Sequence, residues 1–227
     1  MRSTLKNKDK TEASRPARES SSSARKPRQA RAEKSAARRQ AILSAALEEF
    51  SAQGFAATRM DDVAKRAGVA KGTIYLHFQD KEELFQELVR TMLVPLVGAL
   101  EAARPGDQPV RVLIEAFIDL FVREVYGTRR RDMLRLVMTE GPRFPKLADF
   151  YFHNVVERAM AAMRGLIGRA LERGELKNRA LLDYPQLLVA PGIMAIIWSG
   201  LFDRFAPLDI KGLMRVHLDI LFGEAAS

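Results

Sequence analysis

A short stretch around residue 70 carries side chains suited to contacts with a nucleic acid. Ile74 and Phe78 lie four residues apart, which predicts the buried face of a short helix. Lys71, Gly72, Tyr75 and Leu76 then fall on the opposite face, which is basic and aromatic. An ammonium and a phenol both donate hydrogen bonds to phosphates and base edges. The chemistry that this face indicates is DNA binding.

The residues just before this helix predict the element that positions it. Four apolar residues between positions 60 and 67 recur at three- and four-residue steps, which predicts another short helix. Thr58 is the expected N-cap of this helix, and Gly68 is expected to end it. A longer helix over residues 37–52 is expected to pack over both. Two short helices joined by a glycine turn are typical of a DNA-binding helix-turn-helix.

The run from Ala41 to Phe85 resembles the N-terminal domain of TetR/AcrR-family transcriptional regulators. The matching positions are Ile42, Ala45, Phe50, Gly54, Phe55, Thr58, Ala64, Ala67, Gly68, Val69, Gly72, Tyr75, His77, Phe78, Lys81 and Leu84. The resemblance implies an all-α protein. Its N-terminal part would be a three-helix helix-turn-helix DNA-binding domain, and its C-terminal part a helical ligand-binding and dimerisation domain.

The resemblance also implies two groups of DNA contacts. Base edges and the adjacent backbone in the major groove would be met by Lys71, Gly72, Thr73 and Tyr75. Phosphates would be held by Thr58, Tyr75, His77 and Lys81. The alternative for Tyr75 and His77 is simple packing at the end of a short helix. Ala70 stands where many family members have Ser or Thr, so we expect the second helix to start without a side-chain cap.

The sequence offers little for catalysis or metal binding. It holds three histidines, spread over the chain, and no cysteine. His153 and Glu157 share a helix face but lack a further partner, and no phosphate-binding glycine loop or hydrolase motif is present. We expect no enzyme activity, no metal and no cofactor. The lack of cysteine fits a cytoplasmic protein.

All of the net charge of +9 lies at the N-terminus, because residues 1–39 hold 13 Lys and Arg against 4 Asp and Glu, and the remainder holds 24 of each. Residues 1–36 are rich in Ser, Arg and Lys, so we expect a disordered basic tail. This tail is either a solubilising leader or an electrostatic arm for DNA. It leaves open a rival function, a non-specific DNA-binding protein driven by the tail.

Helical patterns continue to the C-terminus. We expect a DNA-binding domain over 37–97 and a helical domain over 98–227, linked by one helix that is kinked at Pro95. A long helix over 144–173 has an inward stripe, which is Leu147, Tyr151, Val155, Ala159, Met163, Leu166 and Leu171. Residues 184–202 carry no charge; a buried helix explains this better than a membrane span does, because prolines and glycines interrupt the segment.

The resemblance implies a cavity among the C-terminal helices that admits a small molecule of unknown identity, apolar or amphipathic. The candidate lining residues are Phe117, Phe121, Met138, Phe150, His153 and Trp198. The implied function is a repressor that binds a palindromic operator in double-stranded DNA as a homodimer and is released by the ligand. The last two helices of each subunit would form the dimer interface, and no membrane partner is expected.

Overall fold

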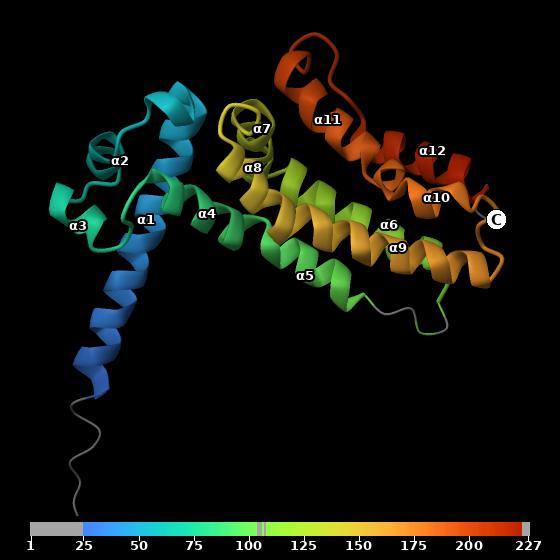
Figure 1. The fold of residues 1–227 in the computed structure, drawn as a ribbon, viewed down its shortest axis with the longest axis horizontal. Helices are drawn as coiled ribbons and strands as arrows, with labels where there is room; N and C mark the ends of the chain where they lie inside the picture. The colour runs from blue at the N-terminus through green and yellow to red at the C-terminus, as the bar shows by residue number, and fades with distance from the viewer. Residues whose placement is uncertain (1–24, 104–105, 107, 224–227) are drawn as a thin grey trace, which may run out of the picture. The chain divides into compact units, whose positions relative to one another are not determined.

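The structure is a computed structural model that describes residues 25–103, 106 and 108–223. The chain forms two compact units, residues 1–38 and residues 39–227. Every regular element in the described ranges is a helix (Figure 1). They are α1 (Arg25–Ala57), α2 (Met60–Arg66), α3 (Lys71–Tyr75), α4 (Lys81–Met92), α5 (Val94–Ala102), α6 (Val110–Phe121), η1 (Val122–Tyr126), α7 (Arg130–Glu140), α8 (Pro145–Tyr151), η2 (Phe152–Val156), α9 (Glu157–Glu172), α10 (Ala180–Asp183), η3 (Pro185–Leu188), α11 (Ala190–Leu201) and α12 (Ile210–Phe222).

Helix α1 begins earlier than the sequence predicts. The segment predicted as a disordered tail, residues 1–36, includes the first twelve residues of this helix, 25–36. Its first 24 residues lie outside the described ranges, and the disorder of the tail stays a prediction. Residues 29–38 are all exposed. Alanine, arginine, lysine and glutamate are strong helix formers, so a helix held by packing further along can extend through them without a tertiary contact.

The helix-turn-helix forms as predicted, with one change at its start. Gly68 takes a positive φ of 66° and separates α2 from α3. The N-cap of α2 is Arg59, without a side-chain hydrogen bond, so the prediction that Thr58 caps this helix is wrong. Helix α3 begins after Ala70 and also lacks a side-chain cap, as the sequence indicates.

The linking helix is two helices instead of one. It breaks at Leu93, where φ is −111° and ψ is −40°, and Pro95 falls in the first turn of α5. A proline cannot donate to the carbonyl four residues earlier, so the hydrogen-bond ladder is interrupted just before it. The break leaves the carbonyl of Met92 free to accept from Arg130 Nε at 2.8 Å.

Two hydrophobic cores hold most of the molecule beyond residue 38. The first joins α1–α4 to α7 and α8, through residues such as Phe50, Phe55 and Met133. The second joins α5 and α6 to α9 and α12, through residues such as Ile167 and Leu218. The first core therefore connects the helix-turn-helix directly to α7 and α8. The predicted domain boundary at residue 97 stays a prediction.

Two π-helical segments interrupt the long helices of the second half. The segment η1 extends α6, and η2 joins α8 to α9, so that residues 145–172 form one long run close to the predicted helix. Residues 184–202 are divided between η3 and α11. In the ranges that the structure covers, we find no helix with the length and apolarity needed to span a membrane.

Candidate nucleic-acid interface and buried cavity

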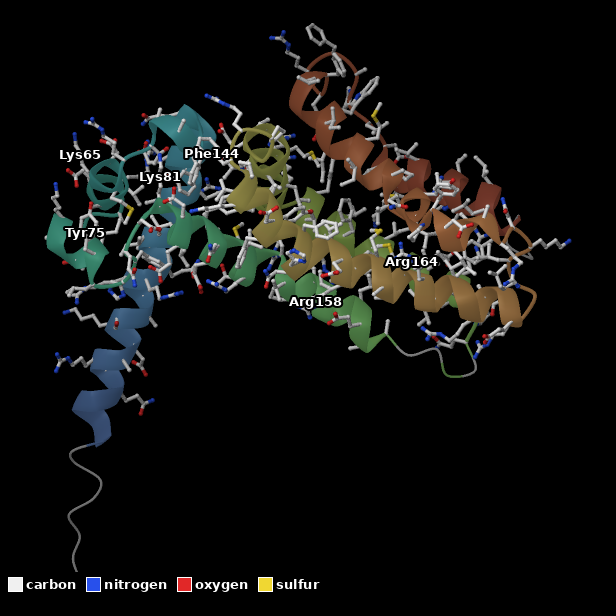
Figure 2. All side chains as sticks on the ribbon, viewed as in Figure 1. Lys65, Tyr75, Lys81, Phe144, Arg158 and Arg164 are labelled. Carbon is white, nitrogen blue, oxygen red and sulfur yellow. The ribbon has the colours of Figure 1, made fainter. Side chains whose placement is uncertain are left out.

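Helix α3 presents the predicted face to solvent. Ile74 is fully buried, whereas the side chain of Lys71 is 68% exposed and Tyr75 is 47% exposed. No other atom lies within 4 Å of the position that a Cβ of Gly72 would take, so the helix surface there is open. Leu76, which the prediction left out of the site, is 84% exposed at the end of the helix. Figure 2 shows Tyr75 at the outer side of α3.

Lys71 is paired within the protein. Its Nζ lies 2.7 Å from Oδ2 of Asp61, in the first turn of α2. The hydrogen bond that the Lys71 ammonium donates to the Asp61 carboxylate raises the pKa of Lys71. The sequence did not indicate this pair, because the approach of α2 to α3 cannot be read from periodicity.

Thr58 and Lys81 both make hydrogen bonds inside the protein, and the prediction that they hold phosphates stays a prediction. Thr58 is 2% exposed, and its hydroxyl donates to the carbonyl of Gly54 at 2.8 Å. Lys81 Nζ donates to the carbonyls of Phe55 at 2.8 Å and Ala56 at 2.9 Å, and lies 3.4 Å from that of Thr58. The last carbonyls of α1 have no helical N–H partners, and the Lys81 ammonium donates hydrogen bonds to two of them.

The other two predicted DNA contacts are neither fully exposed nor fully buried. Thr73 and His77 are half-buried on α3 and directly after it. The ring of His77 stands 6.4 Å from that of Phe78 between centroids, so part of its surface packs against the core. The open part of the interface therefore consists of Lys71, Gly72 and Tyr75, with Leu76 beside them.

A set of ion pairs ties α2 to the start of α7. Arg66, at the end of α2, contacts the buried carboxylate of Glu49 and lies 3.2 Å from Glu48. Arg129 binds the other oxygen of Glu48 at 2.7 Å. Hydrogen bonds from Arg129 and then from Arg66 lower the pKa of Glu48. Glu48 is thus shared between the helix-turn-helix and the segment before α7.

Arg130 makes the corresponding connection to α4. Besides the Met92 carbonyl, it binds the carbonyl of Glu124 at 3.0 Å and the carboxylate of Glu124 at 2.9 Å. Two neighbouring residues therefore contact different helices: Arg129 binds α1, and Arg130 binds the end of α4. The sequence showed these residues only as part of a basic run at a helix boundary.

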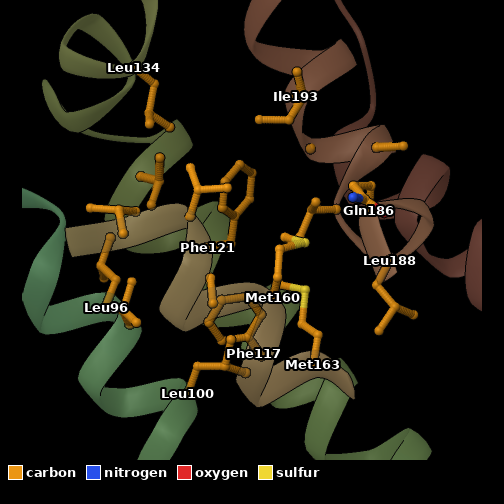
Figure 3. A pocket seen from close by; sticks show the side chains of 18 of the residues that line it. Leu96, Leu100, Phe117, Phe121, Leu134, Met160, Met163, Gln186, Leu188 and Ile193 are labelled. Atoms are coloured by element: carbon orange, nitrogen blue, oxygen red, sulfur yellow. The ribbon is translucent and has the colours of Figure 1, made fainter. Parts of the chain in front are cut away.

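A cavity of about 700 Å³ lies among the helices of the second half, lined by residues of α5–α9, η1–η3, α11 and α12 together with Leu93 and Val189. Figure 3 shows Phe117, Phe121, Met160 and Met163 beside one another at this space. Among the described residues that line it, none is charged, and the polar side chains are those of Tyr151 and Gln186. Burial raises the pKa of Tyr151 to about 12, so its phenol remains protonated at neutral pH.

Three of the six predicted lining residues reach the cavity, namely Phe117, Phe121 and Met138. The other three do not, and each is occupied elsewhere. Arg90 stacks on Phe150 at 4.8 Å from the ring centroid. His153 is exposed and pairs with Glu157 at 3.2 Å. Trp198 donates to the carbonyl of Ala206 at 2.7 Å.

A stronger signal for the cavity wall was present in the sequence. Tyr151, Val155, Ala159 and Met163 line the cavity and belong to the predicted inward stripe of the long helix. The pattern shows that this face is buried, but a packed core and a cavity wall have the same periodicity. Gln186 carried no signal. Within the described ranges no group of His, Cys, Asp and Glu side chains is placed to hold a metal ion.

The outer face of the last two helices is apolar and unpartnered in the single chain. Seven large apolar residues of α11, α12 and the loop between them are at least 42% exposed: Met194, Ile197, Leu201, Phe202, Phe205, Val216 and Ile220. Exposed apolar residues gathered on one face indicate an interaction surface.

Comparison with known proteins adds the following. Residues 42–88 match the family described as bacterial regulatory proteins, tetR family, and residues 114–180 match the C-terminal domain of AefR-like transcriptional repressors. The HTH-type transcriptional regulator AcrR of Shigella flexneri is 40% identical over 197 residues, which cover 81% of this chain and 86% of AcrR. The uncharacterized HTH-type transcriptional regulator YhgD of Bacillus subtilis (strain 168) is 52% identical over 192 residues, 80% of this chain and 94% of YhgD.

Among solved structures, SmeT in complex with triclosan is similar in fold, with a TM-score of 0.68 at 23% identity over 81% of this chain and 89% of SmeT. SmeT is described as the repressor of the Stenotrophomonas maltophilia multidrug efflux pump SmeDEF.

Proposed function

Because the chain belongs to the TetR family of bacterial regulatory proteins, we propose that it is a repressor that binds a palindromic operator as a homodimer and is released by an uncharged apolar ligand. Its membership makes it a DNA-binding transcriptional regulator, not an enzyme, and its C-terminal match is to a repressor. The observation that supports a ligand response is the cavity of about 700 Å³, in which none of the described lining residues is charged.

The DNA contacts follow from the exposed face of α3. Lys71 would donate to guanine O6 and N7 or to a phosphate, and Tyr75 to a phosphate. Gly72 would let the helix approach the base edges closely, and Leu76 would meet a thymine methyl group. Thr73 and His77 would touch the backbone at the edge of this surface. Thr58 and Lys81 are left out because both are used inside the protein.

The ligand class follows from the cavity wall. Burying a charge without a partner costs several kcal/mol or more, so a wall without charged side chains favours a neutral ligand. Methionines at positions 138, 160, 163 and 214 supply adaptable apolar surface. The Tyr151 phenol and the Gln186 amide would orient a single polar group on the ligand.

The coupling between ligand and DNA would pass through residues 129 and 130. Arg129 directly precedes α7 and Arg130 is its first residue. Both η1 and α7 line the cavity, and Arg129 and Arg130 bind α1 and the end of α4 respectively. A ligand that favours a different position of η1 and α7 would therefore shift α1 and α4 with them. The loss of DNA affinity is limited to the ligand's differential affinity for the two conformations.

Footprinting on the DNA upstream of the chain's own gene tests the proposal. At physiological salt we expect protection of a dyad whose half-sites lie about 34–36 Å apart, and its loss on adding a neutral apolar compound that binds the cavity. Ala159→Trp, which places a bulky side chain in the cavity, should keep the footprint and abolish the response. The absence of a protected dyad would refute operator binding.

The exposed face of α11 and α12 would be the dimer interface. Ile220 is 74% exposed on α12, and Ile220→Arg should halve the mass measured by light scattering, because it places two charges in an apolar interface related by two-fold symmetry. Operator affinity should fall by about a hundredfold or more, since the two half-sites are no longer bound together. Val112→Arg, at an exposed site on α6, is the matched control and should leave a dimer.

Residues 1–39 carry all of the net positive charge. This charge supports a second candidate function, which is non-specific DNA binding by the basic segment. Deleting residues 1–36 separates the two. Under the repressor proposal the truncated protein keeps its operator preference, and the slope of log affinity against log salt becomes less steep, because fewer counterions are released. If the truncated protein no longer binds DNA at all in a gel-shift titration, the non-specific function is the correct one.

A further inference from the structure

The side chain of Arg135 connects α7 to α11. Its Nε and Nη2 atoms each lie 3.3 Å from the carbonyl oxygen of Ile196, and Nη2 also donates to the hydroxyl of Ser199 at 2.7 Å. Gly200 leaves room for this contact, because a Cβ there would lie 3.0 Å from Arg135 Nε. In the described part of the chain, no other hydrogen bond joins α7 to α11.

The cavity occupies part of the space between the same two helices. Leu134 of α7 and Ile193 of α11 both line it (Figure 3). Side chains at the wall of a cavity have no packing partners on that side, so they do little to fix one helix against the other. The hydrogen bonds of Arg135 therefore supply a large share of the resistance to movement between α7 and α11.

These two helices lie on the route from the proposed dimer interface to the DNA. Helix α7 shares the first core with α1–α4, and the outer face of α11 carries Met194, Ile197 and Leu201 of the exposed apolar surface. In a symmetric dimer, the position of each recognition helix relative to the two-fold axis sets the distance between the half-sites that are bound together. A change in the angle between α7 and α11 would change that distance.

Resting on the proposed function, we propose that Arg135 is a positioning residue that sets the half-site spacing of the operator. An operator with a different spacing is bound only if α7 moves relative to α11, and the hydrogen bonds of Arg135 oppose this movement. Their loss is a cost for the altered operator alone, because they stay intact on the native spacing. Specificity is a difference between two affinities, so Arg135 raises the preference for one spacing.

Arg135→Met removes the donors and keeps an unbranched apolar side chain. Gel-shift titrations should use the operator found by footprinting and two duplexes with one base pair added or removed between its half-sites. Each change moves the half-sites by about 3.4 Å and turns them by about 34–36°. We expect affinity for the footprinted operator to change by less than about twofold, and affinity for both altered duplexes to rise about three- to tenfold. An equal loss on all three duplexes would overturn the proposal, because it would show a general structural role.

Arg158→Met is the matched control. Arg158 lies on α9 and pairs with Glu101 of α5 at 2.6 Å. Its side chain is 38% exposed, close to the 30% of Arg135. The substitution removes the same charge without touching the contact between α7 and α11, so the ratio of the affinities for native and altered spacing should stay as in the wild type. Equal ratios in Arg135→Met and Arg158→Met would overturn the role of Arg135.

Ser199→Ala tests the contact from the side of α11. By itself it removes one acceptor of Arg135, so the spacing ratio should fall by a smaller factor than in Arg135→Met. In an Arg135→Met background it should cause no further change, because the serine has already lost its partner. The same fall in both backgrounds would contradict the proposal.

The wild-type protein separates this inference from the proposed function. If it protects no dyad, or is a monomer by light scattering, the proposed function fails and this inference fails with it. If it protects a dyad but binds the three duplexes with equal affinity, operator binding stands and only the role of Arg135 fails.

Discussion

Replacing Gly54 with alanine is expected to lower the free energy of unfolding by about 3–5 kcal/mol, through two independent costs. Gly54 has φ 79° and ψ 162°, a conformation nearly confined to glycine. A Cβ there would also lie 2.8 Å from Oε1 of Glu140, a residue that is 8% exposed. The strain and the clash add, because neither relieves the other.

Thermal denaturation measures the effect, and the midpoint should fall by about 6–20 °C for a chain of this size. Gly54→Ala combined with Glu140→Ala should recover the part due to the clash and leave the part due to the backbone. Gly98→Ala is the control, because Gly98 lies inside α5 with no other atom within 4 Å of its Cβ position. It should be neutral or stabilise slightly. Equal midpoints for Gly54→Ala and Gly98→Ala would contradict the strain at Gly54.

The variant Lys81→Met is expected to cost about 2–3 kcal/mol of stability, the value of charge-assisted hydrogen bonds to otherwise unpaired carbonyls. The Lys81 ammonium serves the carbonyls at the end of α1 and lies 4.8 Å from the centroid of the Phe55 ring. Methionine keeps the length and the apolar stem of the side chain but offers no donor. The carbonyls of Phe55 and Ala56 would lose their lysine partner.

This prediction separates two roles for Lys81. As an internal partner of α1, it should affect the denaturation midpoint, while operator affinity at a temperature where the protein is fully folded changes little. As a phosphate contact, it should affect affinity and leave the midpoint alone. Lys65→Met is the control for a lysine of the same region, since Lys65 is exposed on α2. A Lys81→Met protein with an unchanged midpoint and weaker operator binding would restore the phosphate contact.

The sequence by itself determined the helix-turn-helix and the face of α3 that is open to DNA. Both depend on short-range information, namely apolar residues three and four apart and glycines at the ends of helices. The same rule predicted the long helix over 144–173, which α8, η2 and α9 form over 145–172. It also found the family, because the resemblance covers the local motif.

Only the tertiary structure decided where side chains of similar chemistry point. Thr58 and Lys81 have the chemistry of phosphate contacts, but the break of α1 at Gly54 turns both toward its free carbonyls. Periodicity likewise found the buried face of α8 and α9, but could not separate a packed core from the wall of a cavity. That distinction depends on whether another helix fills the space opposite.

The contacts of Arg129 and Arg130 with α1 and α4 were equally beyond the sequence. Arg129 and Arg130 are separated from Glu48 by 81 residues and from Met92 by 38. The neighbouring sequence does not indicate which carboxylate or carbonyl each arginine binds, because these contacts form only when α7 packs against α1 and α4. Local patterns determine elements and their faces, whereas the packing of those elements determines which groups meet.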